Sequence, residues 1–146
     1  QLDVGCLRVR ATGSCVKCIH VVIGDPDGDG KLHLTDVLTA AGSARVPGVF
    51  RDHHSVLDGV TRLNPDLLFV EIAMPIVDGV AITRRLRDAG HRVRCVVIGS
   101  LLTPHDIEAA FHAGARGVLA WRNIPKDGLA CAHVVARGGT WLGTSR

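Results

Sequence analysis

The chain has 146 residues, 47% of them hydrophobic, and a formal net charge of +3. This length suits one domain with its own core and is short for two. The mild charge, without a long basic run, does not by itself indicate binding to nucleic acid or to a membrane surface. No apolar run approaches the ~18 residues of a membrane-spanning helix, and the first residues lack the apolar centre of a signal peptide, so we expect a cytoplasmic protein.

Short apolar runs that favour strands alternate with segments whose apolar residues have helical spacing. In chain order, the predicted pairs of strand and helix are 18–24 with 31–42, 46–50 with 54–65, 66–75 with 78–90, 94–100 with 103–114, and 117–121 with 124–139. Thr103 is expected to cap the fourth helix, with Pro104 as its first residue. The run 66–75 is strongly apolar, which is typical of a parallel strand covered by helices on both faces.

This alternation predicts an α/β fold: a flavodoxin-like, doubly wound (βα)5 parallel sheet with strand order 2-1-3-4-5. We expect residues 1–17 to be an N-terminal extension, residues 18–141 to form the domain and residues 142–146 to be a C-terminal tail. In such sheets the functional crevice lies beyond the carboxyl ends of the strands, where the strand order reverses. The residues expected there are Asp25, Glu71, Gly99, Ser100 and Trp121.

The stretches "NPDLLFVEIAMPIVDGVAITRRLRDAG" (64–90) and "FHAGARGVLA" (111–120) together resemble the receiver domain of two-component response regulators. The Pro-Asp, Met-Pro, Asp-Gly and Ala-Gly-Ala-x-Gly landmarks keep the order and spacing of that family. The resemblance covers residues 18 to 141, the receiver-like domain. The tail "ARGGTWLG" (136–143) is similar to the end of receivers that precede a LuxR-type helix-turn-helix.

The resemblance implies a set of phosphotransfer positions: an acidic pair that holds Mg²⁺, an aspartate that accepts phosphate, and a hydroxyl and a lysine that contact the phosphoryl oxygens. In this sequence these positions fall on Asp25 and Pro26, on Glu71, on Gly99 with Ser100 one residue later, and on Trp121. One acid and the lysine are therefore missing, and the acceptor carboxylate is one methylene longer. With the register shifted by one residue, Ser100 and Arg122 would substitute for the missing groups. The aromatic residue usual near the start of the fifth strand falls on Val118.

These departures predict a degenerate receiver, or pseudo-receiver, of an atypical response regulator, with weak or absent aspartyl phosphorylation and no enzymatic activity. We expect a phosphorylation-independent regulatory and dimerisation module in signal transduction and transcription regulation. Its expected partner is a second copy or another response regulator, held through the segment from Thr103 to Arg137. DNA would be reached only through an attached or partner helix-turn-helix domain, and no membrane partner is expected. The alternatives are a small ligand in the crevice and weak residual phosphorylation of Glu71.

The stretch "DPDGDGKLHLTD" (25–36) has the ligand spacing of an EF-hand calcium loop. However, the run 18–24 before it predicts a strand where an EF-hand has a helix, and the receiver fold needs much of the same stretch for its first helix. We therefore expect no cofactor. Two alternatives remain: weak Ca²⁺ binding by residues 25–36, and a weak Mg²⁺ or Ca²⁺ site formed by Asp25, Asp27 and Glu71.

Overall fold

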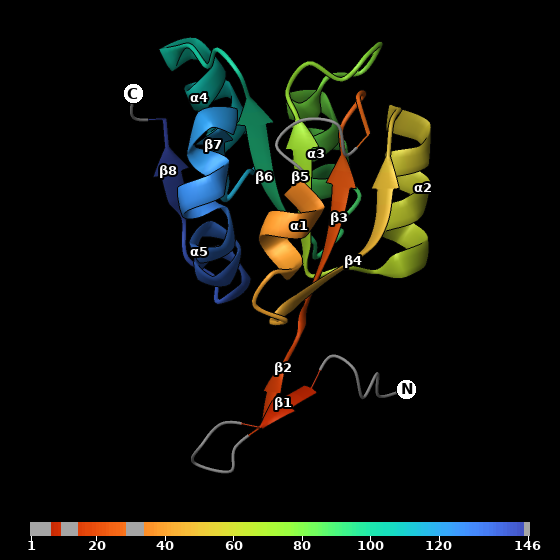
Figure 1. Cartoon of the computed structure of the whole chain (residues 1–146). Helices are drawn as coiled ribbons and strands as arrows, with labels where there is room; N and C mark the ends of the chain where they lie inside the picture. Colours follow the sequence, from red (N-terminus) through yellow and green to blue (C-terminus); the bar gives the residue numbers. More distant parts are fainter. Residues whose placement is uncertain (1–6, 10–14, 29–33, 145–146) are drawn as a thin grey trace.

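The computed structural model describes residues 7–9, 15–28 and 34–144, in which strands and helices alternate along the chain (Figure 1). The strands of the main sheet are β3 (Ile19–Gly24), β4 (Ala44–Phe50), β5 (Leu67–Glu71), β6 (Arg94–Gly99), β7 (Gly117–Ala120) and β8 (Trp141–Gly143). The helices are α1 (Leu34–Thr39), α2 (His53–Leu63), α3 (Gly79–Asp88), α4 (Pro104–His112) and α5 (Ile124–Ala136), with the short 3-10 helix η2 (Trp121–Asn123) before α5. All five predicted strands and all five predicted helices are present.

The six strands form one parallel sheet in the order β4-β3-β5-β6-β7-β8. Its first five strands have the predicted order 2-1-3-4-5, so the flavodoxin-like α/β fold is confirmed. The sixth strand, β8, was not predicted. It pairs Trp141 with Gly117 and Gly143 with Leu119, so the sheet continues two residues past the predicted domain end at 141.

A second, two-stranded sheet lies within the predicted N-terminal extension. Its strands are β1 (Leu7–Val9) and β2 (Cys15–Lys17), which pair antiparallel with Leu7 opposite Lys17. Figure 1 shows this hairpin leading into β3. The extension therefore contains a regular element that the helix and strand patterns of the sequence did not reveal.

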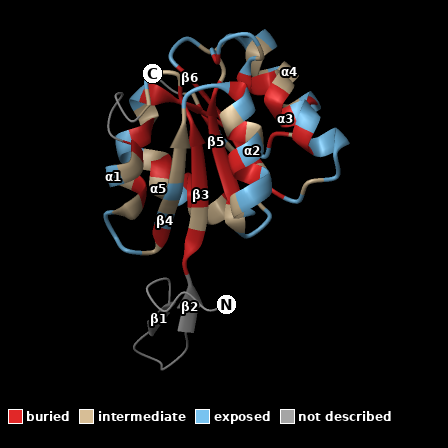
Figure 2. Cartoon of the chain, turned by 90° about the vertical axis from the view of Figure 1, so that its right-hand side faces the viewer, coloured by how far each residue is buried: buried red, intermediate tan, exposed pale blue. Residues whose placement is uncertain are grey.

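Helices cover the main sheet on both faces, which explains the apolar strands. One buried cluster joins the sheet to α1 and α5 and includes Leu38 and Cys131. The other joins it to α2, α3 and α4 and includes Val60 and Ala110. Figure 2 shows the buried central strands between these helices. Every residue of β5 is buried, as expected for the central strand of a sheet that is covered twice.

Side-chain caps fix where three helices begin. The carboxylates of Asp52 and Asp78 accept backbone N–H groups in the first turns of α2 and α3. In α4, Thr103 and Asp106 form a reciprocal capping box, and Pro104 is the first helical residue, as predicted. The α3 cap matters for the site because α3 begins directly beside the end of β5.

Two elements are shorter than the sequence pattern indicated. The first helix spans Leu34–Thr39 within the predicted 31–42, and residues 31–33 lie outside the described part of the chain. The third strand ends at Glu71 instead of Pro75, because the chain turns after Ile72 and the backbone N–H of Gly79 returns to donate to its carbonyl at 3.1 Å. Within the described residues, no helix is both long enough and apolar enough to cross a membrane.

Candidate functional site

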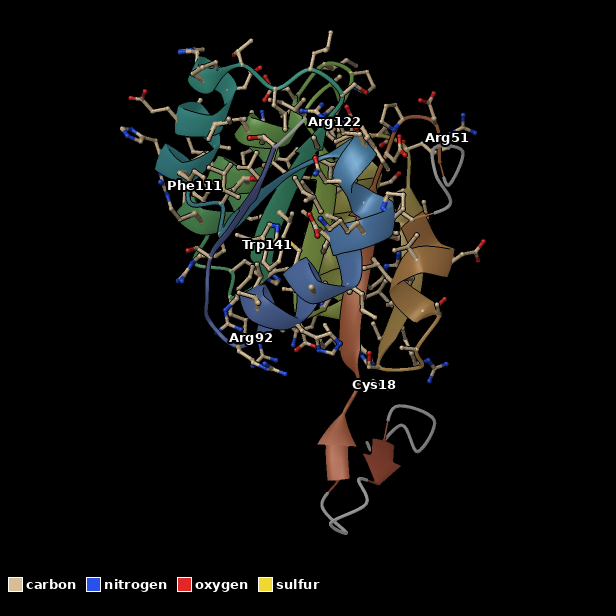
Figure 3. All side chains as sticks on the ribbon, turned by 60° about the vertical axis from the view of Figure 1, so that its left-hand side comes forward. Cys18, Arg51, Arg92, Phe111, Arg122 and Trp141 are labelled. Carbon is tan, nitrogen blue, oxygen red and sulfur yellow. The ribbon has the colours of Figure 1, made fainter. Side chains whose placement is uncertain are left out.

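The predicted crevice residues follow the carboxyl ends of adjacent strands. Asp25 comes directly after β3, Glu71 ends β5, Gly99 ends β6 and Trp121 comes directly after β7. The sheet register places Glu71 opposite Ile98, one residue before Gly99. Because all these strands are parallel, the four residues meet at one edge of the sheet. In Figure 3 this edge is marked by Arg122, the neighbour of Trp121.

Glu71 and Trp121 form the buried centre of this edge. Glu71 is 2% exposed and Trp121 is 5% exposed. The indole Nε1–H of Trp121 donates a hydrogen bond to the Glu71 Oε2 atom. Burial costs a carboxylate its hydrogen bonds to water, so donors from the protein must replace them. The residue at the family's lysine position therefore supplies a neutral donor instead of a cation.

The helix η2 places the indole of Trp121 under the surface. The ring belongs to the apolar cluster shared with α1 and α5, together with Leu34 and Ile124. The ring is thus packed in the core while its N–H reaches the carboxylate. Sequence reasoning put Trp121 and Glu71 at the same edge but did not predict the bond between them.

A glycine holds the start of α3 against the end of β5. A Cβ atom at Gly79 would lie 2.5 Å from the backbone oxygen of Glu71 and 3.0 Å from the Cα atom of Ile72. Only a glycine allows this approach of two backbone segments. The Asp-Gly landmark of the sequence therefore positions the acceptor residue, with Asp78 capping the helix and Gly79 giving it room.

The acidic-pair position is built around a tight turn after β3. Asp25 is 2% exposed, and its Oδ1 accepts the backbone N–H of Asp27 at 3.0 Å. Pro26, which stands at the second acidic position, brings no carboxylate, and its backbone oxygen accepts the Arg51 Nε–H at 3.1 Å. Asp27 is exposed. The turn therefore holds one buried acid, Asp25, and one exposed acid, Asp27.

The three acids proposed for a cation are not brought together. Among the described residues, no group of three or more His, Cys, Asp or Glu side chains could hold a metal ion, and Asp25, Asp27 and Glu71 form no such group. Their distribution explains this, because Asp27 is at the surface while Glu71 is bonded to Trp121 in the interior.

The EF-hand hypothesis for residues 25–36 also disagrees with the fold around it. The segment before the loop is β3, a strand of the main sheet, where an EF-hand has a helix. Asp36, the last proposed ligand, lies in the first turn of α1. Asp29, a central ligand of the motif, lies outside the described residues.

Neither residue at the hydroxyl position provides a buried hydroxyl. A Cβ atom at Gly99 would lie 2.6 Å from Cδ2 of Leu102, so a leucine side chain fills the space that a serine or threonine would need there. Ser100 is exposed. Arg122, the other substitute considered, is exposed and donates from Nη2 to the Thr144 backbone oxygen at 2.7 Å. Leu102 is a site residue that the sequence pattern did not single out.

Two exposed apolar residues lie on the loops beside this edge. Ile76, after β5, is 94% exposed and has a left-handed φ of 68°, which is strained for a β-branched residue. Leu101, after β6, is 88% exposed. Leu101 also lines a cavity of about 750 Å³ with apolar residues of the β6–α4 connection and with Arg122 and Thr144. Val118, at the family's aromatic position, is fully buried.

The fold and the edge just described define a receiver-like α/β domain, and sequence comparison agrees. A family model described as "Response regulator receiver domain" matches residues 21–128. The chain belongs to the response regulator receiver domain family, and it is thus a signal-transduction domain. This family assignment confirms the resemblance drawn from the Met-Pro and Asp-Gly landmarks.

Individual relatives give the same result. The chain is 34% identical over 101 residues to "Protein-glutamate methylesterase/protein-glutamine glutaminase 5" of Myxococcus xanthus, covering 68% of this chain and 29% of that protein. It is 29% identical over 98 residues to "Transcriptional regulatory protein UhpA" of Salmonella typhimurium, covering 67% and 48%. The chain thus spans less than half the length of either curated relative.

Solved structures show the same architecture. The receiver domain of the response regulator NarL from Mycobacterium tuberculosis matches with a TM-score of 0.71 and 26% identity, covering 80% of this chain and 97% of that one. A LuxR-family response regulator from Aurantimonas matches with a TM-score of 0.82 and 15% identity, covering 88% and 91%. The second likeness supports the fold alone.

Proposed function

We propose that this receiver is a degenerate one that works without ordinary aspartyl phosphorylation, as a regulatory and dimerisation module in signal transduction and transcription regulation. The observation that carries the proposal is the buried hydrogen bond from Trp121 to Glu71. The carboxylate at the acceptor position accepts a hydrogen bond from the residue at the lysine position, and both side chains are buried.

Phosphoryl transfer depends almost entirely on positioning and on charge stabilisation. An attacking carboxylate must reach phosphorus in line, with a metal ion and a cation beside the phosphoryl oxygens. Here one Glu71 oxygen is engaged by an indole N–H, the second acid is Pro26, and no cation stands at Trp121. Each change removes a different part of the machinery, so we expect their effects to reinforce one another.

The association surface that we propose is the α4 side of the domain. It comprises Leu101 and the 750 Å³ cavity beside it, which lies within and next to the predicted 103–137 segment. A leucine that is 88% exposed beside a cavity lined partly by apolar side chains favours a protein partner, since burying it removes apolar area from water. The proposed occupant is a second copy of the chain, and a conventional response regulator is the alternative.

DNA would be reached only through a helix-turn-helix domain attached to this chain or to its partner. UhpA, which is named as a transcriptional regulatory protein, is about twice as long as the segment matched in it. A dimer of the receiver would then place two DNA-binding domains on paired half-sites. The domain itself needs no phosphate to do this if its dimer is constitutive.

The test is intact mass spectrometry after incubation with acetyl phosphate and Mg²⁺. We expect no mass gain in the wild-type chain. A gain of one phosphoryl group that Glu71→Gln abolishes would overturn the proposal and show a working, if unusual, phosphoacceptor. A gain that survives Glu71→Gln would place the modification elsewhere and leave the acceptor position inactive, as proposed.

A further inference from the structure

A cationic cavity lies at the end of the sheet opposite the Glu71 edge. It has a volume of about 320 Å³. Its lining residues are Thr83, Leu86, Arg87, Gly90, His91, Arg92, Val93, Arg94, Cys95, Gly114 and Arg116. These belong to α3, the loop between α3 and β6, the start of β6 and the turn before β7. Figure 3 shows Arg92 at this end and Arg122 at the other.

Four arginines line the cavity, but the guanidinium of Arg94 is held on the other face of the sheet, at the end of α5. Arg87 donates from Nη1 to the His112 backbone oxygen at 2.7 Å, and Arg94 donates from Nη1 to the Ala136 backbone oxygen at 3.0 Å. A carbonyl oxygen orients a guanidinium without cancelling its charge. The carboxylate of Asp88 pairs with Arg87 at 3.2 Å, and that pair is half exposed.

The other two arginines are exposed at the cavity mouth. Arg92 and Arg116 make no side-chain hydrogen bond or ion pair within the described residues, so both remain available to a ligand. His91 adds a donor, because its Nδ1 accepts the Val93 backbone N–H at 3.0 Å and the proton of the neutral ring is then on Nε2. The guanidinium groups of Arg87, Arg92 and Arg116 are accompanied by one carboxylate, that of Asp88, which leaves an excess of positive charge.

The buried wall of the cavity adds no negative charge. Cys95 is buried there with Thr83, and burial raises the pKa of the Cys95 thiol to about 12. The thiol therefore stays neutral at physiological pH. The cavity thus combines arginine and histidine side chains with neutral ones, and such a lining favours an anion.

We propose that this cavity binds a small phosphorylated molecule that carries two linked phosphate groups. Guanidinium groups match phosphate oxygens with paired N–H bonds, and those of Arg92 and Arg116 at this cavity have no side-chain partner within the described residues. The volume is at the lower end of the range for small-ligand sites, of about 300 Å³ upward. A concave pocket of this size favours a compact diphosphate over a nucleic acid, whose backbone needs an extended basic stripe.

The site is independent of the proposed function, since it is at the opposite edge of the sheet and shares no residue with Glu71 or Trp121. A ligand there would contact α3, β6 and the turn before β7 at once. Binding would therefore stabilise the packing of α3 against the sheet, which gives a second readout in the melting temperature.

The experiment is calorimetric titration of the full chain with inorganic pyrophosphate and, separately, with inorganic phosphate. We expect one pyrophosphate per chain, bound about tenfold or more tightly than phosphate, with a rise in melting temperature. The variant R92A/R116A should weaken pyrophosphate binding by about tenfold or more, whereas R84A/R85A should change it by less than about twofold. Arg84 and Arg85 are exposed on α3 outside the cavity, so this control removes the same charge.

Three results would overturn the proposal. One is the absence of pyrophosphate binding at millimolar concentration in low salt. Another is an equal loss in the two double variants, which would reduce the effect to net charge. The third is binding of duplex DNA, lost in R92A/R116A, by a chain that does not bind pyrophosphate, because it would assign the arginines to a nucleic-acid surface. If the melting temperature of R92A/R116A equals that of the wild type, the loss of binding is not a loss of folding.

Discussion

Trp121 donates its indole N–H to the buried carboxylate of Glu71, so the two residues that stand at the family's lysine and acceptor positions are bonded to each other. In the phosphotransfer arrangement both would face a phosphoryl group. Here their polar atoms satisfy one another inside the domain. The pair therefore contributes to stability, and in the function proposed above it also withholds the carboxylate at the acceptor position from a phosphodonor.

Removing this donor should destabilise the fold. Trp121→Phe keeps most of the ring but deprives a buried carboxylate of a hydrogen bond, at a cost of about 1–3 kcal/mol in the free energy of unfolding. Trp141→Phe is the matched control, because the Trp141 indole N–H is buried without a partner among the described residues. Chemical denaturation of both variants measures the difference. Equal losses would show that the bond contributes nothing beyond ring packing.

Rebuilding the family's groups should restore phosphorylation. The variant P26D/E71D/W121K supplies the second acid, the shorter acceptor and the cation. We expect it to gain one phosphoryl group from acetyl phosphate and Mg²⁺, more slowly than a complete site because Leu102 still fills the hydroxyl position. The control P26D/E71N/W121K should gain none. A triple variant as inert as the wild type would mean that the edge is blocked by more than these three residues.

Gly79→Ala should be destabilising because of its backbone neighbour. Its Cβ would meet the backbone oxygen of Glu71 at 2.5 Å, and neither β5 nor α3 can move without disturbing the core. We expect a loss of about 1–3 kcal/mol. Gly128→Ala, within α5, is the contrast: its nearest neighbours are side chains at 3.3 Å and beyond. It should be about as stable as the wild type, and similar losses in both would contradict the backbone argument.

The hydrogen bonds by which Asp52 caps α2 should make a pH-dependent contribution to the free energy of unfolding. Hydrogen bonds from Ser55 lower the pKa of the Asp52 carboxyl in the folded state. The cap therefore stabilises the fold fully above the unfolded pKa of about 3.9, and this stabilisation is lost as the pH falls through the lower pKa of the folded state. The stability gap between the wild type and Asp52→Ala should therefore shrink in acid. Thermal melts of the two at neutral and acidic pH measure it, and a gap that is independent of pH would contradict it.

The sequence predicted the parallel sheet and its helices because their patterns are local and repeated. It predicted Thr103 and Pro104 as a helix start because the capping chemistry lies within a few residues. It did not predict β8, a three-residue strand. This strand is held by pairing with β7 and by contact with α5, and its three residues show no hydrophobic pattern of their own. Short edge strands carry too few residues to establish a period.

The candidate site was predicted as a set of positions and not as a set of contacts. Alignment placed Glu71 and Trp121 at one edge, but the direction of the indole depends on η2 and on the apolar cluster beneath it. The filling of the Gly99 position by Leu102 likewise depends on how the β6–α4 loop folds back. The hypothesis of a cation site formed by Asp25, Asp27 and Glu71 had the same weakness. Sequence spacing does not distinguish the exposed Asp27 from the buried Glu71.

The most direct measurement of the central claim is the molar mass of the wild-type chain in solution, by light scattering, with and without acetyl phosphate and Mg²⁺. The account predicts a dimer of the same mass in both samples, and a monomer for Leu101→Asp, which puts a charge on the proposed association surface. A chain that is monomeric alone and dimeric only with the phosphodonor would contradict it, since association would then depend on phosphorylation.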